Sequence, residues 1–278
     1  MQGKHILITG ATNGIGLAAG EALAALGASV AIVGRSETRT RIAAAQIRAA
    51  AKGATVATFV ADLSSQASVR TLAAEVLARC PRLDVLINNA GAMHGTRQLT
   101  KDGIELTWAV NHLAPFLLTT LLFDRLKASA PARIITTASD AHQGARIPFE
   151  DLNAERSYRG FGRYGETKLA NILFTAELAR RLEGSGVTAN SYHPGLVATG
   201  FNRHNGLLMD LGMTALKLVA RSPQTGADTL VWLATSPDVA DVSGRYFFDR
   251  GQRAPSPEGQ DMQAALRLWE ISERQCGS

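Results

Sequence analysis

Short apolar runs alternate with longer amphipathic stretches along most of the 278-residue chain. Near-continuous apolar runs are typical of strands buried on both faces of a parallel sheet. They predict strands at 4–9, 29–34, 55–60, 83–88, 132–138, 187–193 and 244–248. Apolar residues at helical spacing predict helices at 15–26, 38–52, 66–79, 103–128, 162–184 and, in pieces, 205–235. This alternation predicts an α/β fold of the Rossmann type: a doubly wound, mostly parallel, seven-stranded sheet with helices on both faces.

Two regions depart from the alternation, within what we expect to be a single domain over residues 1–278. Residues 200–222 are rich in Leu and Met, which is consistent with an apolar flap over a pocket or, equally, with a helix packed on the core. From about residue 250 a C-terminal tail with Pro255 and Pro257 breaks the pattern, and a last helix is expected from about Glu258 to Gln275.

The segment from Leu106 to Phe123 carries no formal charge and has about the minimum length of a membrane span. It also contains Asn111, His112 and Pro115, and the two polar side chains would be costly in lipid. We therefore expect a buried helix against the sheet, which could also face a partner subunit.

A glycine-rich turn follows the first predicted strand, in the run Thr9-Gly10-Ala11-Thr12-Asn13-Gly14-Ile15-Gly16. Strand, glycine turn and helix form the context in which a dinucleotide pyrophosphate sits on a helix N-terminus. The spacing is Gly-x-x-x-Gly-x-Gly, and no Gly-Lys-Ser/Thr ending follows, which excludes a nucleoside triphosphatase loop. Glycines that only turn the chain are the alternative interpretation.

Tyr164 and Lys168 lie four residues apart in a predicted helix, so their side chains share one face. A phenol has a pKa near ~10, and a neighbouring cation lowers it by favouring the phenolate. The pair could therefore supply a general acid or base, provided that other chemistry accompanies it, since chance often produces Tyr-x-x-x-Lys.

Taken together, the glycine turn, the Asn88-Asn89-Ala90-Gly91 run, Ser139 and the Tyr164/Lys168 pair resemble the short-chain dehydrogenase/reductase family. The likeness covers residues 4–246 and is greatest for the retinol-dehydrogenase-like branch. The segments that indicate this branch are Val110–Leu113, Ser139–His142, Lys168–Phe174 and His193–Gly195.

The resemblance implies a nicotinamide dinucleotide cofactor. Its implied binding residues are Gly10, Thr12, Asn13, Gly14, Ile15, Gly16, Arg35, Asp62, Leu63, Asn89, Ala90, Gly91, Asn111, Tyr164, Lys168, Pro194, Gly195, Val197 and Thr199. Asp62 would meet the adenine edge, although it could instead cap the following helix, as Ser64 or Ser65 also could. Asn88 could tie adjacent strands.

The end of the second predicted strand bears on the choice between NAD and NADP. An NAD site usually places an acid there, but the chain has Gly34-Arg35-Ser36. Arginine can pair with a 2′-phosphate, so we expect NADP(H) to be preferred. Glu37 argues for NAD unless it begins the next helix, and Arg35 alone could be a solvated turn residue.

The resemblance also implies catalytic roles for Asn111, Ser139, Tyr164 and Lys168. Ser139 would donate to the substrate oxygen, and Tyr164 would act as general acid or base. Lys168 would lower the Tyr164 pKa and hold the nicotinamide ribose, while Asn111 would bind a water linking Lys168 to solvent. A buried bridging amide and a strand-end hydroxyl are the ordinary alternatives for Asn111 and Ser139. Met93, Ser139 and Tyr164 are the candidate substrate contacts.

Composition excludes other classes of function. The net charge of +5 is scattered without a basic, aromatic-interleaved face, so no nucleic-acid partner is expected. The two cysteines are far apart and the six histidines lack metal spacing, so neither a disulfide nor a metal site is expected. His142 and His193 are assigned no catalytic role. Since the first predicted strand begins within about four residues, we expect neither a signal peptide nor a membrane anchor, and a cytoplasmic location.

We therefore predict an oxidoreductase that interconverts an alcohol and a carbonyl on a medium to large hydrophobic molecule. Reduction of a carbon–carbon double bond and a catalytically silent dinucleotide sensor remain the alternatives. A homo-oligomer is possible from the resemblance alone, and the physiological substrate and reaction direction stay open.

Overall fold

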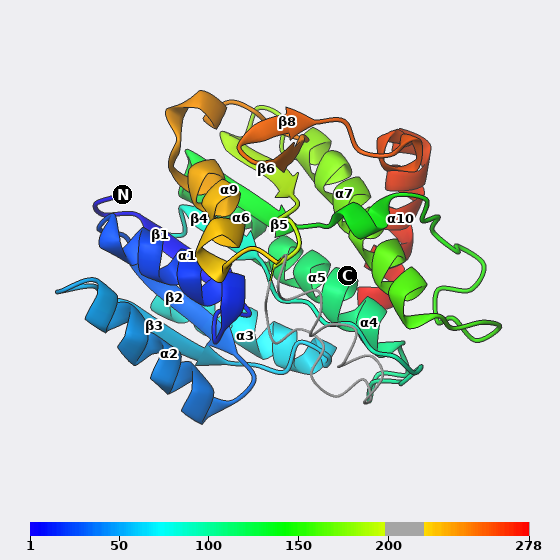
Figure 1. Cartoon of the computed structure of the whole chain (residues 1–278), viewed down its shortest axis with the longest axis horizontal. Helices are drawn as coiled ribbons and strands as arrows, with labels where there is room; N and C mark the ends of the chain where they lie inside the picture. The colour runs from blue at the N-terminus through cyan, green and yellow to red at the C-terminus, as the bar shows by residue number, and fades with distance from the viewer. Residues whose placement is uncertain (198–219, 278) are drawn as a thin grey trace.

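The computed structural model describes residues 1–197 and 220–277 of the chain. One eight-stranded sheet runs through it in the order β3-β2-β1-β4-β5-β6-β7-β8 (Figure 1). The strands are β1 (His5–Thr9), β2 (Ser29–Gly34), β3 (Val56–Val60), β4 (Val85–Asn88), β5 (Ala132–Thr137), β6 (Val187–Tyr192), β7 (Tyr246–Phe248) and β8 (Gly251–Arg253). Neighbouring strands pair in parallel from β3 to β7, as predicted.

The eighth strand corrects the predicted count of seven. β8 pairs antiparallel with β7 at the edge of the sheet, through a register that matches Tyr246 with Arg253. It was missed because its sequence, Gly-Gln-Arg, is polar and fully exposed, so no apolar run marks it.

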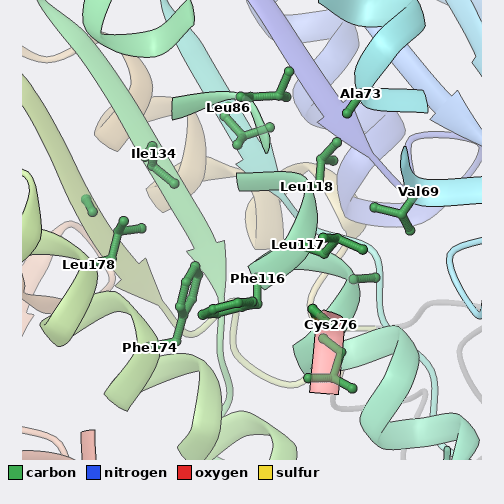
Figure 2. Packing of buried hydrophobic residues seen from close by; sticks show 14 of the residues in the cluster. Val69, Ala73, Leu86, Phe116, Leu117, Leu118, Ile134, Phe174, Leu178 and Cys276 are labelled. Atoms are coloured by element: carbon green, nitrogen blue, oxygen red, sulfur yellow. The ribbon is translucent and has the colours of Figure 1, made fainter. Parts of the chain in front are cut away.

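Helices cover both faces of the sheet (Figure 1). The first face carries α1 (Gly14–Ala25), α2 (Glu37–Ala50) and α9 (Pro223–Thr235), and the second carries α3 (Gln66–Arg79), α5 (Ala114–Leu121), α7 (Gly160–Arg181) and α10 (Met262–Cys276). Successive residues of a strand point to opposite faces, so Ile6 and Ile8 belong to the first core and Leu7 to the second. Figure 2 shows the second core, where Phe116 and Phe174 lie over Leu86 and Ile134 of the sheet.

The helix predicted at 103–128 is broken into four pieces. They are α4 (Leu106–Trp108), a π-helical turn (Ala109–Leu113), α5 and α6 (Phe123–Ala128). Both Glu105 carboxylate oxygens accept backbone hydrogen bonds at the start of α4, from Thr107 and Trp108. Pro115 has no N–H to donate to the Asn111 carbonyl, so the regular helical ladder cannot continue there. Single π-turns of this kind are frequent at functional sites.

The C-terminal tail is built into the core. Within it lie a 3₁₀ turn (Pro257–Gln260) and α10, and two further 3₁₀ turns occur earlier (Asp140–His142 and Pro237–Val239). Trp269 of α10 stacks on Phe174 of α7, with ring centroids 5.9 Å apart, and meets Phe116 edge-on at 4.9 Å. The last helix of the chain thus packs against α7 and contacts α5 through Phe116.

Among the described residues, no helix combines the length and the apolar character needed to cross a bilayer. In the same part of the chain, no group of three or more His, Cys, Asp or Glu side chains is placed to hold a metal ion. Most of the predicted flap, 200–219, and the candidate Thr199 lie outside the described residues.

Candidate active site

The candidate site lies at the carboxyl ends of the parallel strands, where the polar residues singled out in the sequence gather. β1 and β4 are neighbours, so the turns that follow them touch. Gly10 has φ +66°, and a Cβ built on it would lie 2.7 Å from the Cα of Ala90. A Cβ on Gly16 would lie 2.5 Å from the carbonyl oxygen of Gly10. Neither glycine leaves room for a side chain, so these positions require glycine for a close approach of backbone segments.

Asn89 joins the two turns. Its Nδ2 donates to the carbonyl oxygens of Thr9 at 3.0 Å and Gly10 at 3.2 Å. The Thr9 hydroxyl oxygen in turn accepts from the backbone N–H groups of Asn89 and Ala90, both at 3.1 Å. The strand-tying role expected of Asn88 therefore belongs to Asn89, since Asn88 Nδ2 donates instead to Thr119 of α5 at 2.9 Å. Successive residues of a strand point to opposite faces, so Asn88 and Asn89 lie on opposite sides of the strand end and take different partners.

A polar hollow opens at the end of β2, lined by Thr12, Arg35, Ser36 and Arg39. Ser36 caps α2 by accepting from the backbone N–H of Arg39, and Glu37 is the first residue of the helix. Glu37 thus has the helix-starting role that was considered for it. Arg39 was not among the predicted cofactor residues, although three-residue spacing from an N-cap serine places it in the first helical turn. Two arginines therefore flank one hollow at the position where an acid is typical of an NAD site.

Asp62 follows β3 and lies in a local turn. Its Oδ1 accepts from both the backbone N–H and the hydroxyl of Ser64, at 3.0 and 2.7 Å. Ser65, not Asp62, caps α3 by accepting from Ser68. Leu63, next in the chain, is partly buried against the second core. The carboxylate of Asp62 is therefore not needed for the helix and stays exposed at the strand end.

Tyr164 and Lys168 lie on α7, one turn apart, facing Ser139 at the end of β5. Lys168 is buried, donates from Nζ to the carbonyl oxygen of Thr137 at 2.9 Å, and places Nζ 5.4 Å from the centroid of the Tyr164 ring. A Cβ on Gly91 would lie 3.4 Å from the same Nζ. The structure thus brings the lysine and tyrosine together with the turn that follows β4.

Burial governs the protonation of this pair. It raises the pKa of Tyr164 to about 12, and the hydrogen bond with the Ser139 side chain lowers that pKa in part. Burial also lowers the pKa of Lys168 to about 7. We expected Lys168 to lower the pKa of Tyr164 toward 7. For the protein without cofactor this expectation is wrong, because burial raises that pKa. Desolvation opposes both charged forms, and a lysine that is half neutral at pH 7 stabilises a phenolate less.

Asn111 sits in the π-helical turn, and its amide is fully engaged in holding the segment after Gly91. Oδ1 accepts from the Ala92 N–H at 2.7 Å, and Nδ2 donates to the Ala92 carbonyl at 2.8 Å and to the Thr167 hydroxyl at 3.0 Å. The bridging role considered for Asn111 is therefore present. The water link between Asn111 and Lys168 stays a prediction.

The turn after β6 closes the site on the other side. Gly195 has φ +81°, and a Cβ on it would lie 2.8 Å from Arg221 Cδ. Val197 pairs with Arg221 in an isolated bridge and packs against Gly226 at the start of α9. The turn that contains Pro194, Gly195 and Val197 is thereby fixed against α9, beside the N-terminal end of α1.

The candidate substrate contact Met93 is buried beside residues 140–160, the long connection between β5 and α7, hereafter the insertion. Tyr158 of the insertion donates its hydroxyl to the carbonyl oxygen of His94 at 2.8 Å, and a Cβ on Gly160 would lie 2.4 Å from the same oxygen. Residues 93–94 and the insertion therefore form one wall next to the first turns of α7.

A buried ion pair that the sequence did not suggest anchors this wall. Arg163 Nε donates to Glu105 Oε2 at 2.7 Å, and both side chains are buried. Arg163 also pairs with Glu166 at 2.9 Å and donates to the carbonyl oxygen of Leu152 in the insertion. The residue directly before Tyr164 thus ties α4, α7 and the insertion together.

Comparison with known proteins shows the family to which the chain belongs. The chain belongs to the short-chain dehydrogenase family, whose model, described as short chain dehydrogenase, matches residues 4–207. Within the family it falls among the retinol-dehydrogenase-like members, which confirms the resemblance noted in the sequence. It is 45% identical to retinol dehydrogenase 14 of Mus musculus, over 100% of this chain and 87% of that relative. It is 43% identical to retinol dehydrogenase 13 of Homo sapiens, over 99% and 85%.

Solved structures show the same fold. An uncharacterised protein from Mycobacterium paratuberculosis has a TM-score of 0.80 and 32% identity, over 100% of this chain and 94% of that one. A short chain dehydrogenase from Burkholderia cenocepacia J2315 in complex with NADP has a TM-score of 0.71 and 30% identity, over 88% and 96%. The protein is thus an oxidoreductase of a family that uses a nicotinamide dinucleotide and acts on small molecules.

Proposed function

We propose that the protein is an NADP(H)-dependent oxidoreductase that interconverts an alcohol and a carbonyl on a medium to large hydrophobic molecule. The observation that carries the proposal is the meeting of Tyr164, Ser139 and Lys168 at the strand ends, next to the glycine turn. A phenol hydrogen-bonded to a serine hydroxyl, with a buried lysine behind its ring, is a proton-transfer site.

The residues at the site fit a nicotinamide dinucleotide. Gly10 and Gly16 leave bare backbone at the N-terminus of α1, where amide groups and the helix dipole favour a pyrophosphate. The positive φ of Gly195 shapes a second turn across from Lys168. These two turns are the supports for the two ends of the dinucleotide.

Each catalytic residue has a distinct task. The bound cofactor supplies or accepts the hydride. Ser139 donates a hydrogen bond to the substrate oxygen, whose negative charge grows in the transition state of reduction. Tyr164 transfers its hydroxyl proton to that oxygen, or removes the proton in oxidation. Lys168, in its charged form, stabilises the phenolate that results, and a cationic nicotinamide ring would favour that phenolate further.

Two arginines support the preference for NADP(H). Arg35 and Arg39 line the hollow after β2, whereas Glu37, the first residue of α2, is not among its lining residues. A 2′-phosphate is a better partner than a hydroxyl for guanidinium groups, because charge-assisted hydrogen bonds are stronger. The NADP that accompanies the Burkholderia cenocepacia relative agrees with this preference.

A hydrophobic substrate is supported by the relatives that are named retinol dehydrogenases. Buried Met93 in the wall beside α7 agrees with an apolar substrate site. Retinoid aldehydes and alcohols are accordingly the first compounds to test.

The experiment is a panel of aldehydes, ketones and activated alkenes offered to the purified protein with NADPH, followed by the absorbance of the reduced cofactor. We expect oxidation of NADPH with long apolar aldehydes or ketones, and alcohol as the product. Turnover of alkenes alone would replace the proposal by carbon–carbon double-bond reduction. Tight NADPH binding without any turnover would replace it by a dinucleotide sensor.

A further inference from the structure

Two residues without a catalytic role connect the two sides of the site. Asp140 directly follows Ser139, and His193 directly precedes Pro194. Their backbones belong to the ends of β5 and β6, which are adjacent strands. Any contact between their side chains therefore sets the distance between the serine and the turn that contains Gly195.

Asp140 is held from three directions. Its Oδ1 accepts from the Tyr246 hydroxyl of β7 at 2.9 Å, and its Oδ2 lies 3.3 Å from Arg253 of β8. Its backbone N–H donates to Nδ1 of His193 at 3.3 Å, while Nε2 of the same ring lies 3.3 Å from Oδ2. The edge hairpin of β7 and β8, with its short polar strand, thus serves to fix the residue after Ser139.

The ring of His193 is itself fixed. It stacks on Phe248 with ring centroids 5.1 Å apart and an interplanar angle of 21°, and it is only 11% exposed. Because Nδ1 accepts from the Asp140 N–H, the neutral ring carries its proton on Nε2, toward the Asp140 carboxylate. This neutral tautomer is the one in which Nδ1 can accept from the Asp140 N–H.

We propose that His193 is a positioning residue that holds Ser139 in register with the Pro194–Gly195 turn, and that protonation of its Nδ1 releases this hold at acidic pH. The inference rests on the proposed function, in which Ser139 contacts the substrate and the turn contacts the cofactor. When Nδ1 gains a proton it becomes a donor facing the donor N–H of Asp140, so the hydrogen bond is lost.

Burial and the neighbouring cations keep the ring of His193 neutral at pH 7. Burial lowers the pKa of His193, as do Arg253, Arg221 and His142, whereas Asp140 raises it. Arg221 is itself paired with Asp249. The lowering effects prevail, so His193 releases Ser139 only below its ordinary pKa of about 6.5.

His142 secures Ser139 from the opposite side and does not share this behaviour. It is fully buried, its Nδ1 lies 2.6 Å from the Ser139 carbonyl oxygen, and its Nε2 accepts from the Ser256 N–H at 3.1 Å. Here the ring nitrogen next to Ser139 is the donor. His193 is the ring that accepts from the N–H of Asp140, the residue after Ser139. His193 is therefore the residue to substitute.

The test compares His193→Phe, which keeps the stacking on Phe248 but has no acceptor, with His193→Asn, whose amide oxygen can accept but does not titrate. For the wild type we expect kcat with NADPH to fall as the pH drops below the ordinary histidine pKa of about 6.5. In His193→Phe we expect kcat to be about 10- to 100-fold below the wild-type value at neutral pH and to approach the wild-type value in acid, with the NADPH Kd unchanged. His193→Asn should recover most of that loss and show no fall in acid. Asp228→Asn removes an exposed partner of Arg250 and serves as the control that behaves as wild type.

A second readout does not need turnover: amide hydrogen exchange of residues 139–142 at several pH values, corrected for intrinsic rates. Protection should fall in acid for the wild type, persist for His193→Asn and be absent for His193→Phe. An acid limb in kcat that survives in His193→Asn, or unchanged kcat and protection in His193→Phe, would overturn the inference. If the wild type shows the expected exchange pattern but turns over no substrate, only the proposed function is contradicted, and the positioning role of His193 stands.

Discussion

The ammonium group of Lys168 lies 5.4 Å from the centre of the Tyr164 ring, and no charged side chain is among the causes of the pKa shift of Lys168. Its Nζ bonds to the Thr137 carbonyl, a neutral acceptor. A buried cation whose hydrogen-bond acceptor is neutral destabilises the folded protein, and such strain is typical of functional sites. Lys168 is therefore expected to lower the free energy of unfolding of the protein.

That cost should appear as a pH dependence of stability. The Lys168 pKa is about 7 in the folded protein, against an ordinary value of 10.5 for a solvated lysine. Between these values the unfolded chain binds a proton that the folded chain does not, so stability rises with pH. We expect the free energy of unfolding of the wild type, relative to Lys168→Met, to increase by about 2–3 kcal/mol from pH 7 to pH 9, at about 1.36 kcal/mol per unit.

Urea denaturation of the ligand-free protein at several pH values measures this difference. Below pH 7 both states are protonated, so Lys168→Met should be the more stable protein there. Lys101→Met, at an exposed position, is the matched control and should run parallel to the wild type. A wild-type curve that stays parallel to that of Lys168→Met would show that burial does not depress the lysine pKa.

The hollow after β2 predicts how the cofactor preference can be changed. Removing one guanidinium group from a 2′-phosphate should cost roughly 1.5–3 kcal/mol. Arg35→Ala and Arg39→Ala should therefore each weaken NADPH binding by about 10- to 100-fold and leave NADH binding nearly unchanged.

Titration of cofactor fluorescence on each variant gives these affinities. Arg41→Ala, an exposed arginine of the same helix that does not line the hollow, is the control. If NADPH and NADH bind the wild type equally well, the arginines do not select the phosphate. If only Arg35→Ala weakens NADPH binding, Arg39 does not contact the 2′-phosphate.

The buried Glu105–Arg163 pair predicts a large effect on stability. Glu105→Gln removes the carboxylate that pairs with the buried guanidinium of Arg163, and it removes the negative charge that caps α4. Removing one partner of a buried pair typically costs about 3–5 kcal/mol. Glu166 still pairs with Arg163, so we expect about 3 kcal/mol, seen as a lower midpoint in urea.

Glu75→Gln gives the comparison for that experiment. Glu75 faces Arg79 at 4.0 Å on the surface, where such pairs contribute about 0–1 kcal/mol. Equal effects of Glu105→Gln and Glu75→Gln would mean that the buried pair does not anchor the start of α7.

The sequence predicted those parts of the fold that depend on local pattern. Apolar runs located seven strands, because burial on both faces leaves a mark on every residue of a strand. β8 left no such mark, since its three residues are polar or glycine and exposed. The break at Ala109–Leu113 was also not predicted, although Pro115 in an apolar helical stretch was a signal for it.

The residues of the site also divide into those that a local motif predicts and those that depend on distant partners. Gly10, Asn89, Tyr164 and Lys168 occur in short motifs, so their positions could be inferred from the sequence alone. Arg163 and Asp140 act through partners that are distant in sequence, such as Glu105 and Arg253, and no spacing rule connects them. The pKa values could not be inferred either, because desolvation depends on the packing around a side chain and not on its neighbours along a helix.

The central claim is that Tyr164 transfers the proton at the site. Tyr164→Phe removes the hydroxyl group and keeps the ring beside Lys168, so NADPH binding should be nearly unchanged. With a carbonyl substrate identified from the panel, we expect kcat to fall by about 10²–10⁴-fold. Phe161→Tyr, which adds a hydroxyl at an exposed position one turn earlier in α7, should retain wild-type turnover. The decisive measurement is single-turnover oxidation of NADPH by Tyr164→Phe and wild type side by side: a loss of that size with intact cofactor affinity is the predicted result, and turnover above half of the wild-type rate would contradict the account.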